Sequence, residues 1–251
     1  LKRDYLLHAV PKDDHLHWSD LTDYSEPQNI DIFKVSLSGP DPVTAALNKL
    51  GLDIGGERFL LVSGSMDIRD GLAHVVGALY ASGLTTGEML DFFKGLQIFS
   101  IGNYSFGKPG WLDPDNFHES FRDFLPVDDF KSLKIPLKVT ATNILDGKLK
   151  VFEKGSLVRP LLASAAFPGV FAPVEHDQGY YVDGGVLNNF PADLLREECE
   201  RLIGVYVNPF EEVKRSEIRN SITVLERVLK LKTAQESIQK FDLCDLVVYP
   251  K

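Results

Sequence analysis

Short apolar runs that alternate with segments of helical spacing constrain the fold of this chain more than any other feature. Residues 32–39 and 58–65 are such runs, and each is followed by a segment with apolar residues at helical spacing, 42–53 and 70–83. The run at 58–65 reads RFLLVSGS and has the apolar character of a strand that is covered on both faces. This strand–helix–strand–helix order predicts an α/β fold with parallel strands joined by right-handed crossovers.

The rest of the chain continues with segments of both kinds. The predicted helices cover residues 85–96, 116–125, 158–171, 192–199 and 216–240, with Thr86 as the N-cap of the first. The predicted strands cover residues 135–144, 148–155 (a partly exposed edge), 201–209 and 244–250, while 180–191 form a strand that passes into a loop. Residues 98–117 are aromatic and rich in turn residues, so we expect a loop there.

Composition limits the domain organisation and the partners. Residues 1–30 are polar and irregular, so we expect an N-terminal extension before one domain over 31–251. The chain is 44% hydrophobic with a formal net charge of −9, which argues against nucleic acid as a partner. A local basic or apolar patch leaves peripheral membrane contact open, and the oligomeric state is not predicted. The first residues lack an apolar run of signal-peptide or membrane-span length, so we predict a cytoplasmic location.

No metal or cofactor is expected from the sequence. The acids and histidines within residues 13–17 have no second ligand cluster of matching spacing. Cys199 and Cys244 are too few for a disulfide framework or a metal site, so we expect two buried thiols. Phosphate-loop and dinucleotide fingerprints are also missing.

The segment Val182-Asp183-Gly184-Gly185 is the strongest candidate for chemistry. A carboxylate at the end of an apolar strand lies where open α/β sheets place their ligands. Gly184 and Gly185 permit a tight turn and a close backbone approach, so the carboxylate can be held at that turn. The alternative is a helix-start turn in which Asp183 only accepts hydrogen bonds from backbone amides.

The longer context of this segment resembles a known family. Residues 157–196, LVRPLLASAAFPGVFAPVEHDQGYYVDGGVLNNFPADLLR, are similar to the signature of bacterial patatin-like phospholipases. The similarity continues through residues 74–93, 106–113, 135–152 and 202–210, and covers about residues 59–250. It implies a three-layer α/β fold with a central, mostly parallel sheet flanked by helices. It also implies that Asp183, supported by Gly184 and Gly185, is the base of a Ser–Asp dyad that needs no cofactor.

In that family the nucleophile lies in Gly-x-Ser-x-Gly, a sharp turn between a strand and a helix. Here no serine near the end of the run 58–65 has glycine both two positions before it and two positions after it. The best match keeps Gly64 and takes Ser65 as the nucleophile, with Asp67 where the second glycine would stand. A side chain at that position is expected to crowd the elbow. A turn serine that bonds to backbone is the alternative for Ser65.

The oxyanion hole implied by the resemblance is a Gly-rich loop after the first strand. Residues 38–42 read SGPDP at this place, and both prolines lack an N–H while the aspartate adds negative charge. The backbone N–H groups near Gly39 and Met66 are the candidate donors to the oxyanion.

Other reactive or aromatic side chains have structural interpretations that we favour. Ser82 and Ser164 are expected to pack or cap within helices, and His74 to be a helical histidine with one polar partner rather than a triad member. Several aromatic side chains could line an acyl-chain rim, although core burial is expected for most of them. These are Phe92, Phe93, Tyr104, Phe106 and Trp111.

The resemblance implies a serine lipid acyl hydrolase that cleaves fatty-acyl esters of phospholipids or lysophospholipids with Ser65 and Asp183. The changes around the elbow and in residues 38–42 support an alternative, a patatin-fold protein of impaired catalysis that binds lipid or a protein partner. A third hypothesis is that segments of the sequence have been omitted or redesigned.

Overall fold

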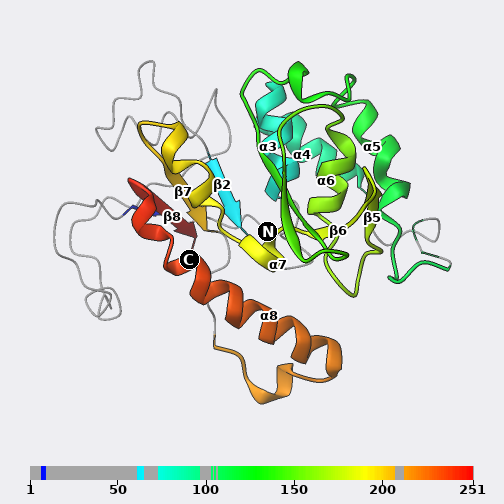
Figure 1. Ribbon diagram of the computed structural model, residues 1–251, viewed down its shortest axis with the longest axis vertical. Coiled ribbons are helices and arrows are strands. Elements are labelled where there is room, and N and C mark those ends of the chain that lie inside the picture. The colour runs from blue at the N-terminus through cyan, green and yellow to red at the C-terminus, as the bar shows by residue number, and fades with distance from the viewer. Residues whose placement is uncertain are drawn as a thin grey trace.

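A computed structural model describes residues 7–9, 61–64, 73–96, 103, 105, 107–206 and 212–250. Its strands form two four-stranded sheets with helices packed against each of them (Figure 1). The chain therefore has an α/β fold. One of the two sheets is antiparallel throughout, so the expected single, mostly parallel central sheet is not confirmed. The strand predicted at 32–39 and the helix predicted at 42–53 lie outside the described residues.

The first sheet contains the parallel strands that the alternating pattern predicts. Its order is β1-β8-β7-β2, in which β2 and β8 run parallel to β7 and β1 runs antiparallel to β8. The strands are β1 (Leu7–Ala9), β2 (Leu61–Gly64), β7 (Ile203–Tyr206) and β8 (Leu246–Pro250). Residues 1–30 were expected to be irregular, and β1 corrects this for Leu7–Ala9, because pairing with β8 satisfies the backbone there.

The second sheet is an antiparallel meander with the order β4-β3-β6-β5. Its strands are β3 (Val139–Asn143), β4 (Lys148–Phe152), β5 (Val174–His176) and β6 (Gly179–Asp183). Strand β4 lies at an edge with alternating exposure, as predicted. Strand β5 is missing from the sequence-based assignment. The turn that joins it to β6 has positive φ at Asp177 and Gln178 (43° and 64°), which is the backbone of a two-residue hairpin.

The helices before the Asp183 segment are short. They are α3 (Ala73–Ser82), α4 (Thr86–Gly95), α5 (His118–Arg122) and α6 (Val158–Ser164), with 3₁₀ turns η2 (Pro114–Phe117) and η3 (Phe130–Ser132). The N-cap of α4 is Thr85 and not Thr86, because the Thr85 side chain accepts the Glu88 N–H while the Glu88 carboxylate accepts the Thr85 N–H. Helix α6 ends before the predicted 171, since Pro168 follows and Gly169 has a φ of 87°.

The helices after Asp183 include one long element. They are α7 (Gly185–Asn188) and α8 (Ser221–Ile238), with 3₁₀ turns η4 (Ala192–Leu194), η5 (Arg196–Glu198), η6 (Arg215–Glu217) and η7 (Phe241–Leu243). The helix predicted over 192–199 is instead two 3₁₀ turns, separated at Leu195, whose φ of −121° is outside the helical range. Helix α8 begins after Asn220, whose side chain accepts the Thr223 N–H.

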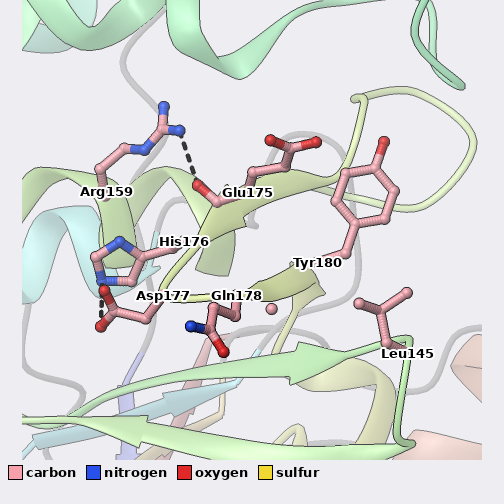
Figure 2. A pocket seen from close by; sticks show the side chains of 8 residues that line it. Leu145, Arg159, Glu175, His176, Asp177, Gln178 and Tyr180 are labelled. Atoms are coloured by element: carbon pink, nitrogen blue, oxygen red, sulfur yellow. Dashed lines mark hydrogen bonds and ion pairs between the residues drawn. The ribbon is translucent and has the colours of Figure 1, made fainter.

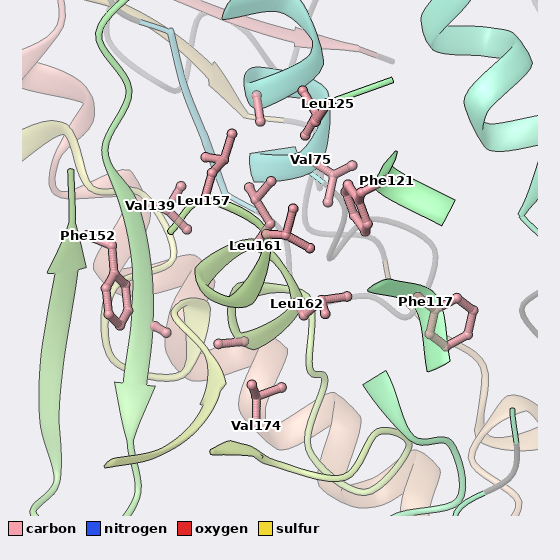
Figure 3. Packing of buried hydrophobic residues seen from close by; sticks show 14 of the residues in the cluster. Val75, Phe117, Phe121, Leu125, Val139, Phe152, Leu157, Leu161, Leu162 and Val174 are labelled. Atoms are coloured by element: carbon pink, nitrogen blue, oxygen red, sulfur yellow. The ribbon is translucent and has the colours of Figure 1, made fainter. Parts of the chain in front are cut away.

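The largest apolar core lies between the antiparallel sheet and helices α3, α4, α5 and α6. Figure 3 shows Leu161 and Leu162 of α6 between strand residues such as Val139 on one side and Phe121 on the other. A second core joins the first sheet to the segment after α7, where Phe190 packs against Tyr206 at a ring-centroid distance of 6.1 Å. A Cβ at Gly204 in β7 would lie 2.4 Å from Phe190 Cζ, so this contact requires glycine.

Candidate active site

Asp183 is the last residue of β6 and lies opposite Ala141 of β3. Its backbone N–H donates to the carbonyl of Ala166 at 3.0 Å, so the loop after α6 also fixes the end of the strand. The side chain is 3% exposed. The strand pattern and the two glycines therefore lead to a carboxylate held inside the protein at a strand end.

The two carboxylate oxygens of Asp183 have different surroundings. Oδ1 accepts the N–H of Gly185 at 2.8 Å, which is the helix-start contact considered in the sequence analysis. Oδ2 is buried, and no donor among the described residues reaches it. Burial raises the pKa of Asp183 from 3.8 to about 7, and the hydrogen bond from Gly185 opposes that rise. The arrangement provides a carboxylate whose proton affinity suits a general base near neutral pH.

Gly184 and Gly185 each have a specific part in this turn. A Cβ at Gly184 would lie 2.5 Å from the carbonyl oxygen of Thr140, so a side chain there would push the turn away from β3. Gly185 supplies the N–H that fixes Oδ1 and begins α7. Both glycines thus support the orientation of Asp183 through the backbone.

A polar network fastens α7 to the far end of α8. Lys240 Nζ donates to Asn188 Oδ1 and to Asp193 Oδ1, both at 2.7 Å. Asn188 Nδ2 in turn donates to Asp193 Oδ1 at 3.1 Å. Sequence reasoning did not find Lys240, because it lies 52 positions after Asn188 and no local pattern connects the two residues.

Of the segment that is expected to carry the nucleophile, the structure describes residues 61–64, which end at Gly64. This residue ends β2 and pairs in register with Tyr206 of β7. Tyr206 packs against Phe190, which follows Asp183 by seven positions, and in Figure 1 the arrowhead of β2 points toward α7. The contacts therefore connect the end of β2 with the turn at Asp183. Ser65, Met66 and Gly39 lie outside the described residues.

His74 and Ser164 form a structural pair between α3 and α6. His74 Nδ1 and Ser164 Oγ are 2.7 Å apart, and Ser164 is 1% exposed. Burial lowers the pKa of His74 to about 4, so its ring is neutral at pH 7 and is a weak base. The prediction of a helical histidine with one polar partner is confirmed. Ser82 donates to the carbonyl of Leu79 at 2.7 Å, as expected of a capping serine.

Two of the hollows lined by described residues differ in size and in their place relative to Asp183. An apolar hollow of about 40 Å³ is lined by Val75, Phe117, Leu162 and Ala165 among others, and Ala165 precedes the residue that accepts the Asp183 N–H. Figure 2 shows a larger, open hollow of about 560 Å³ at the β5–β6 turn, where Arg159 donates to the Glu175 carbonyl. The larger hollow lies at the opposite end of β6 from Asp183. Asp183 lines neither of these hollows, and the apolar one is linked to it only through Ala165 and Ala166.

The aromatic residues considered for an acyl-chain rim differ in their exposure to solvent. Phe92 is 2% exposed and belongs to the main core, and Phe93 packs partly against that core. Trp111 is 63% exposed, while Tyr104 and Phe106 lie outside the described residues.

In the described part of the chain, no three His, Cys, Asp or Glu residues gather in a way that could hold a metal ion. None of the described helices combines the length and the apolar character needed to cross a bilayer. Cys244 is buried, Cys199 is partly buried, and they form no disulfide.

Comparison with known proteins shows a family similarity around Asp183. Residues 75–196 match the sequence model of the patatin-like phospholipase family, and this span contains Asp183, Gly184 and Gly185. Over these residues the chain is similar to the patatin-like phospholipase family. The patatin-like match begins after Gly64 and Ser65, so those two positions lie outside it.

The relatives of this patatin-like chain include proteins of bacteria and of a virus. It is 29% identical over 198 residues to uncharacterized NTE family proteins of Mycobacterium bovis and Mycobacterium tuberculosis, which covers 76% of the chain and 52% of each relative. The chain thus spans about half the length of these curated relatives. A probable lipid hydrolase of Invertebrate iridescent virus 6 is 36% identical over 63 residues, or 23% of the chain and 22% of that protein.

Proposed function

We propose that this patatin-like chain is a serine hydrolase that cleaves fatty-acyl esters of phospholipids or lysophospholipids. The match to the patatin-like phospholipase family suggests lipid hydrolysis, and the viral relative bears the name of a probable lipid hydrolase. The coarse function rests on the family, and the residue roles rest on the geometry of Asp183.

The observation that carries the proposal is the divided hydrogen bonding of Asp183. One oxygen is fixed by the Gly185 N–H, while the other is buried with no donor among the described residues. A turn residue of purely structural role needs the first contact but gains nothing from an unpaired second oxygen, which is costly to bury. Strained or unpaired groups of this kind gather at functional sites.

The proposed reaction uses Asp183 as base and Ser65 as nucleophile. Asp183 accepts the Ser65 hydroxyl proton while the serine oxygen attacks the ester carbonyl, and backbone N–H groups near Gly39 and Met66 stabilise the oxyanion. The C–O bond to the alcohol breaks, and the alcohol leaves with the proton from Asp183. Water then attacks the acyl-serine, giving its proton to Asp183, and the fatty acid departs as Ser65 regains its proton.

The second candidate is a patatin-fold protein that binds lipid or a protein partner without catalysis. Asp67 at the second elbow position and the two prolines within residues 38–42 favour it, because a crowded elbow and missing N–H donors both weaken acyl transfer. Loss of one oxyanion donor alone typically lowers the rate by about 10²–10³-fold.

A fluorophosphonate probe that labels activated serines separates the two candidates. We expect labelling of the unmodified chain, its loss in Ser65→Ala, and a strong reduction in Asp183→Asn. Ser164→Ala is the matched control, because Ser164 has a histidine partner but is 1% exposed, and its labelling should equal that of the unmodified chain. Absence of labelling in the unmodified chain would favour the binding protein, and labelling that survives in Ser65→Ala would refute the assignment of the nucleophile.

A further inference from the structure

Helix α8 presents a stripe of exposed aliphatic side chains. Val224, Val228 and Leu231 follow one another at positions i, i+4 and i+7, and Leu225 lies beside them. Their side chains are 48%, 56%, 40% and 54% exposed in the order Val224, Val228, Leu231 and Leu225. Single exposed aliphatic residues are ordinary, but this spacing places the four on one face of the helix. We call them the α8 stripe.

The opposite face of α8 is already in contact with the rest of the protein. Thr233, Ala234 and Ser237 are buried there, and Ser237 Oγ accepts the side-chain N–H of Asn189 at 3.4 Å. Leu229 and Val186 of α7 both pack against the apolar cluster of Leu112, Phe167 and Val170. The α8 stripe is therefore directed away from α7, and Figure 1 shows the N-terminal part of the helix extending beyond both sheets.

The surroundings of the stripe are basic in a chain that is acidic as a whole. Residues 213–238 hold six Lys or Arg against three Glu, a net charge of +3, whereas the whole chain carries −9. The helical rotation of 100° per residue places Arg227 on one border of the stripe and Lys232 within it, between Val228 and Leu225. Lys232 Nζ lies 3.8 Å from the Glu236 carboxylate. Lys214, Arg215 and Arg219 are exposed just before the helix.

We propose that the α8 stripe docks on an anionic lipid bilayer surface. Aliphatic side chains would enter the boundary between headgroups and acyl chains, while the basic groups of residues 213–238 would meet lipid phosphates. Charge complementarity selects this occupant, because a second copy of the chain docked through the same stripe would bring together two segments that each carry a net charge of +3. The stripe requires no activity, so the proposal is independent of the hydrolase.

Docking through α8 would also bring the lipid surface to the helix that is fastened to the segment after Asp183. The network of Lys240 with Asn188 and the contact of Ser237 with Asn189 fasten α8 to the segment that follows Asp183. A bilayer against the stripe therefore lies along the helix that supports the turn of the candidate base.

Co-sedimentation of the whole chain with vesicles tests the proposal. The probes are vesicles of phosphatidylcholine alone and of phosphatidylcholine mixed with phosphatidylglycerol. We expect binding to the mixed vesicles that weakens at high salt, and a loss of about tenfold or more in Val228→Asp, because an aliphatic contact is replaced by a charge of the wrong sign. Leu145→Asp is the matched control, since Leu145 is 68% exposed in the β3–β4 turn and its change should leave binding intact.

A second variant keeps the test decisive if Val228→Asp does not fold. Arg227→Gln combined with Lys232→Gln retains the aliphatic residues, and we expect it to weaken binding to mixed vesicles about tenfold or more. Asp183→Asn should bind as the unmodified chain does, which separates failure of docking from failure of the hydrolase. Failure of the unmodified chain to bind mixed vesicles, equal losses in Val228→Asp and Leu145→Asp, or a change of oligomeric state on Val228→Asp would each overturn the proposal.

Discussion

At the scale of single residues, the buried carboxylate of Asp183 is the most informative group. Its raised pKa follows from desolvation, and the contact with Gly185 offsets part of that effect. The same burial that suits a base near neutral pH also makes the ionised form unfavourable for the fold. Asp183 therefore links the proposed chemistry to the stability of the protein.

We expect the stability of the unmodified chain to fall, relative to that of Asp183→Asn, as the pH rises from about 4 to about 7. Between these values the unfolded chain has released the Asp183 proton while the folded chain retains it, so rising pH favours unfolding. Urea unfolding at about pH 5 and about pH 8 should show Asp183→Asn gaining roughly 2–3 kcal/mol.

Asp193→Asn is the control with the opposite effect for this comparison. Burial would raise the pKa of Asp193, but its hydrogen bonds with Lys240 and Asn188 lower it overall. Its ionised form thus stabilises the fold and is already complete at pH 5, so Asp193→Asn should lose stability by a similar amount at both pH values. Parallel behaviour of the two variants would contradict the assignment of Asp183 as a desolvated group.

The pair of His74 and Ser164 gives a second prediction at this scale. Ser164→Ala leaves a ring nitrogen without its hydrogen-bond partner between two packed helices. We expect a loss of about 1–3 kcal/mol in the free energy of unfolding, measured by denaturant titration at neutral pH. Ser132→Ala, at an exposed 3₁₀ turn, should change the free energy by less than about 0.5 kcal/mol. Equal losses in both variants would show that the buried pair contributes no more to the free energy of unfolding than an exposed serine does.

At the scale of elements, the sequence located helices and strands better than it located their ends. The capping signal of α4 was present as Thr85 with Glu88 three positions later, yet two adjacent threonines made Thr86 an equally plausible cap. Strand β5 was not predicted, because a strand of three residues is too short to show a period-2 pattern. Its turn at Asp177 and Gln178 also lacks the usual glycine.

The cap of α4 can be tested with the same two threonines. Thr85→Ala removes the side chain that accepts the Glu88 N–H, so we expect a loss of about 1 kcal/mol in the free energy of unfolding. Thr86→Ala, one position into the helix, should lose less than half as much. Thermal and denaturant unfolding of the two variants in the same buffer measures the difference, and a larger loss at Thr86 would return the cap to the predicted position.

At the scale of the whole molecule, the sequence established the α/β class but not how the strands divide into sheets. Apolar periodicity identifies β2, β7 and β8 as strands, but their neighbours are chosen by contacts between distant segments, such as Phe190 against Tyr206. The turn at Asp183 was predictable because its glycines and strand are adjacent in sequence. Lys240 and the unpartnered face of α8 were not, because both depend on which sides of the helices meet.

The contact between Phe190 and Gly204 affects the distance between the Asp183 turn and the first sheet. An aromatic ring rests on bare backbone there, so the thickness of that ring sets how near the Asp183 turn comes to the β2–β7 edge. Even a methyl group at position 204 would collide with the Phe190 ring and push the two segments apart. The distance between Ser65 and Asp183 of the proposed dyad would then increase, although neither residue is changed.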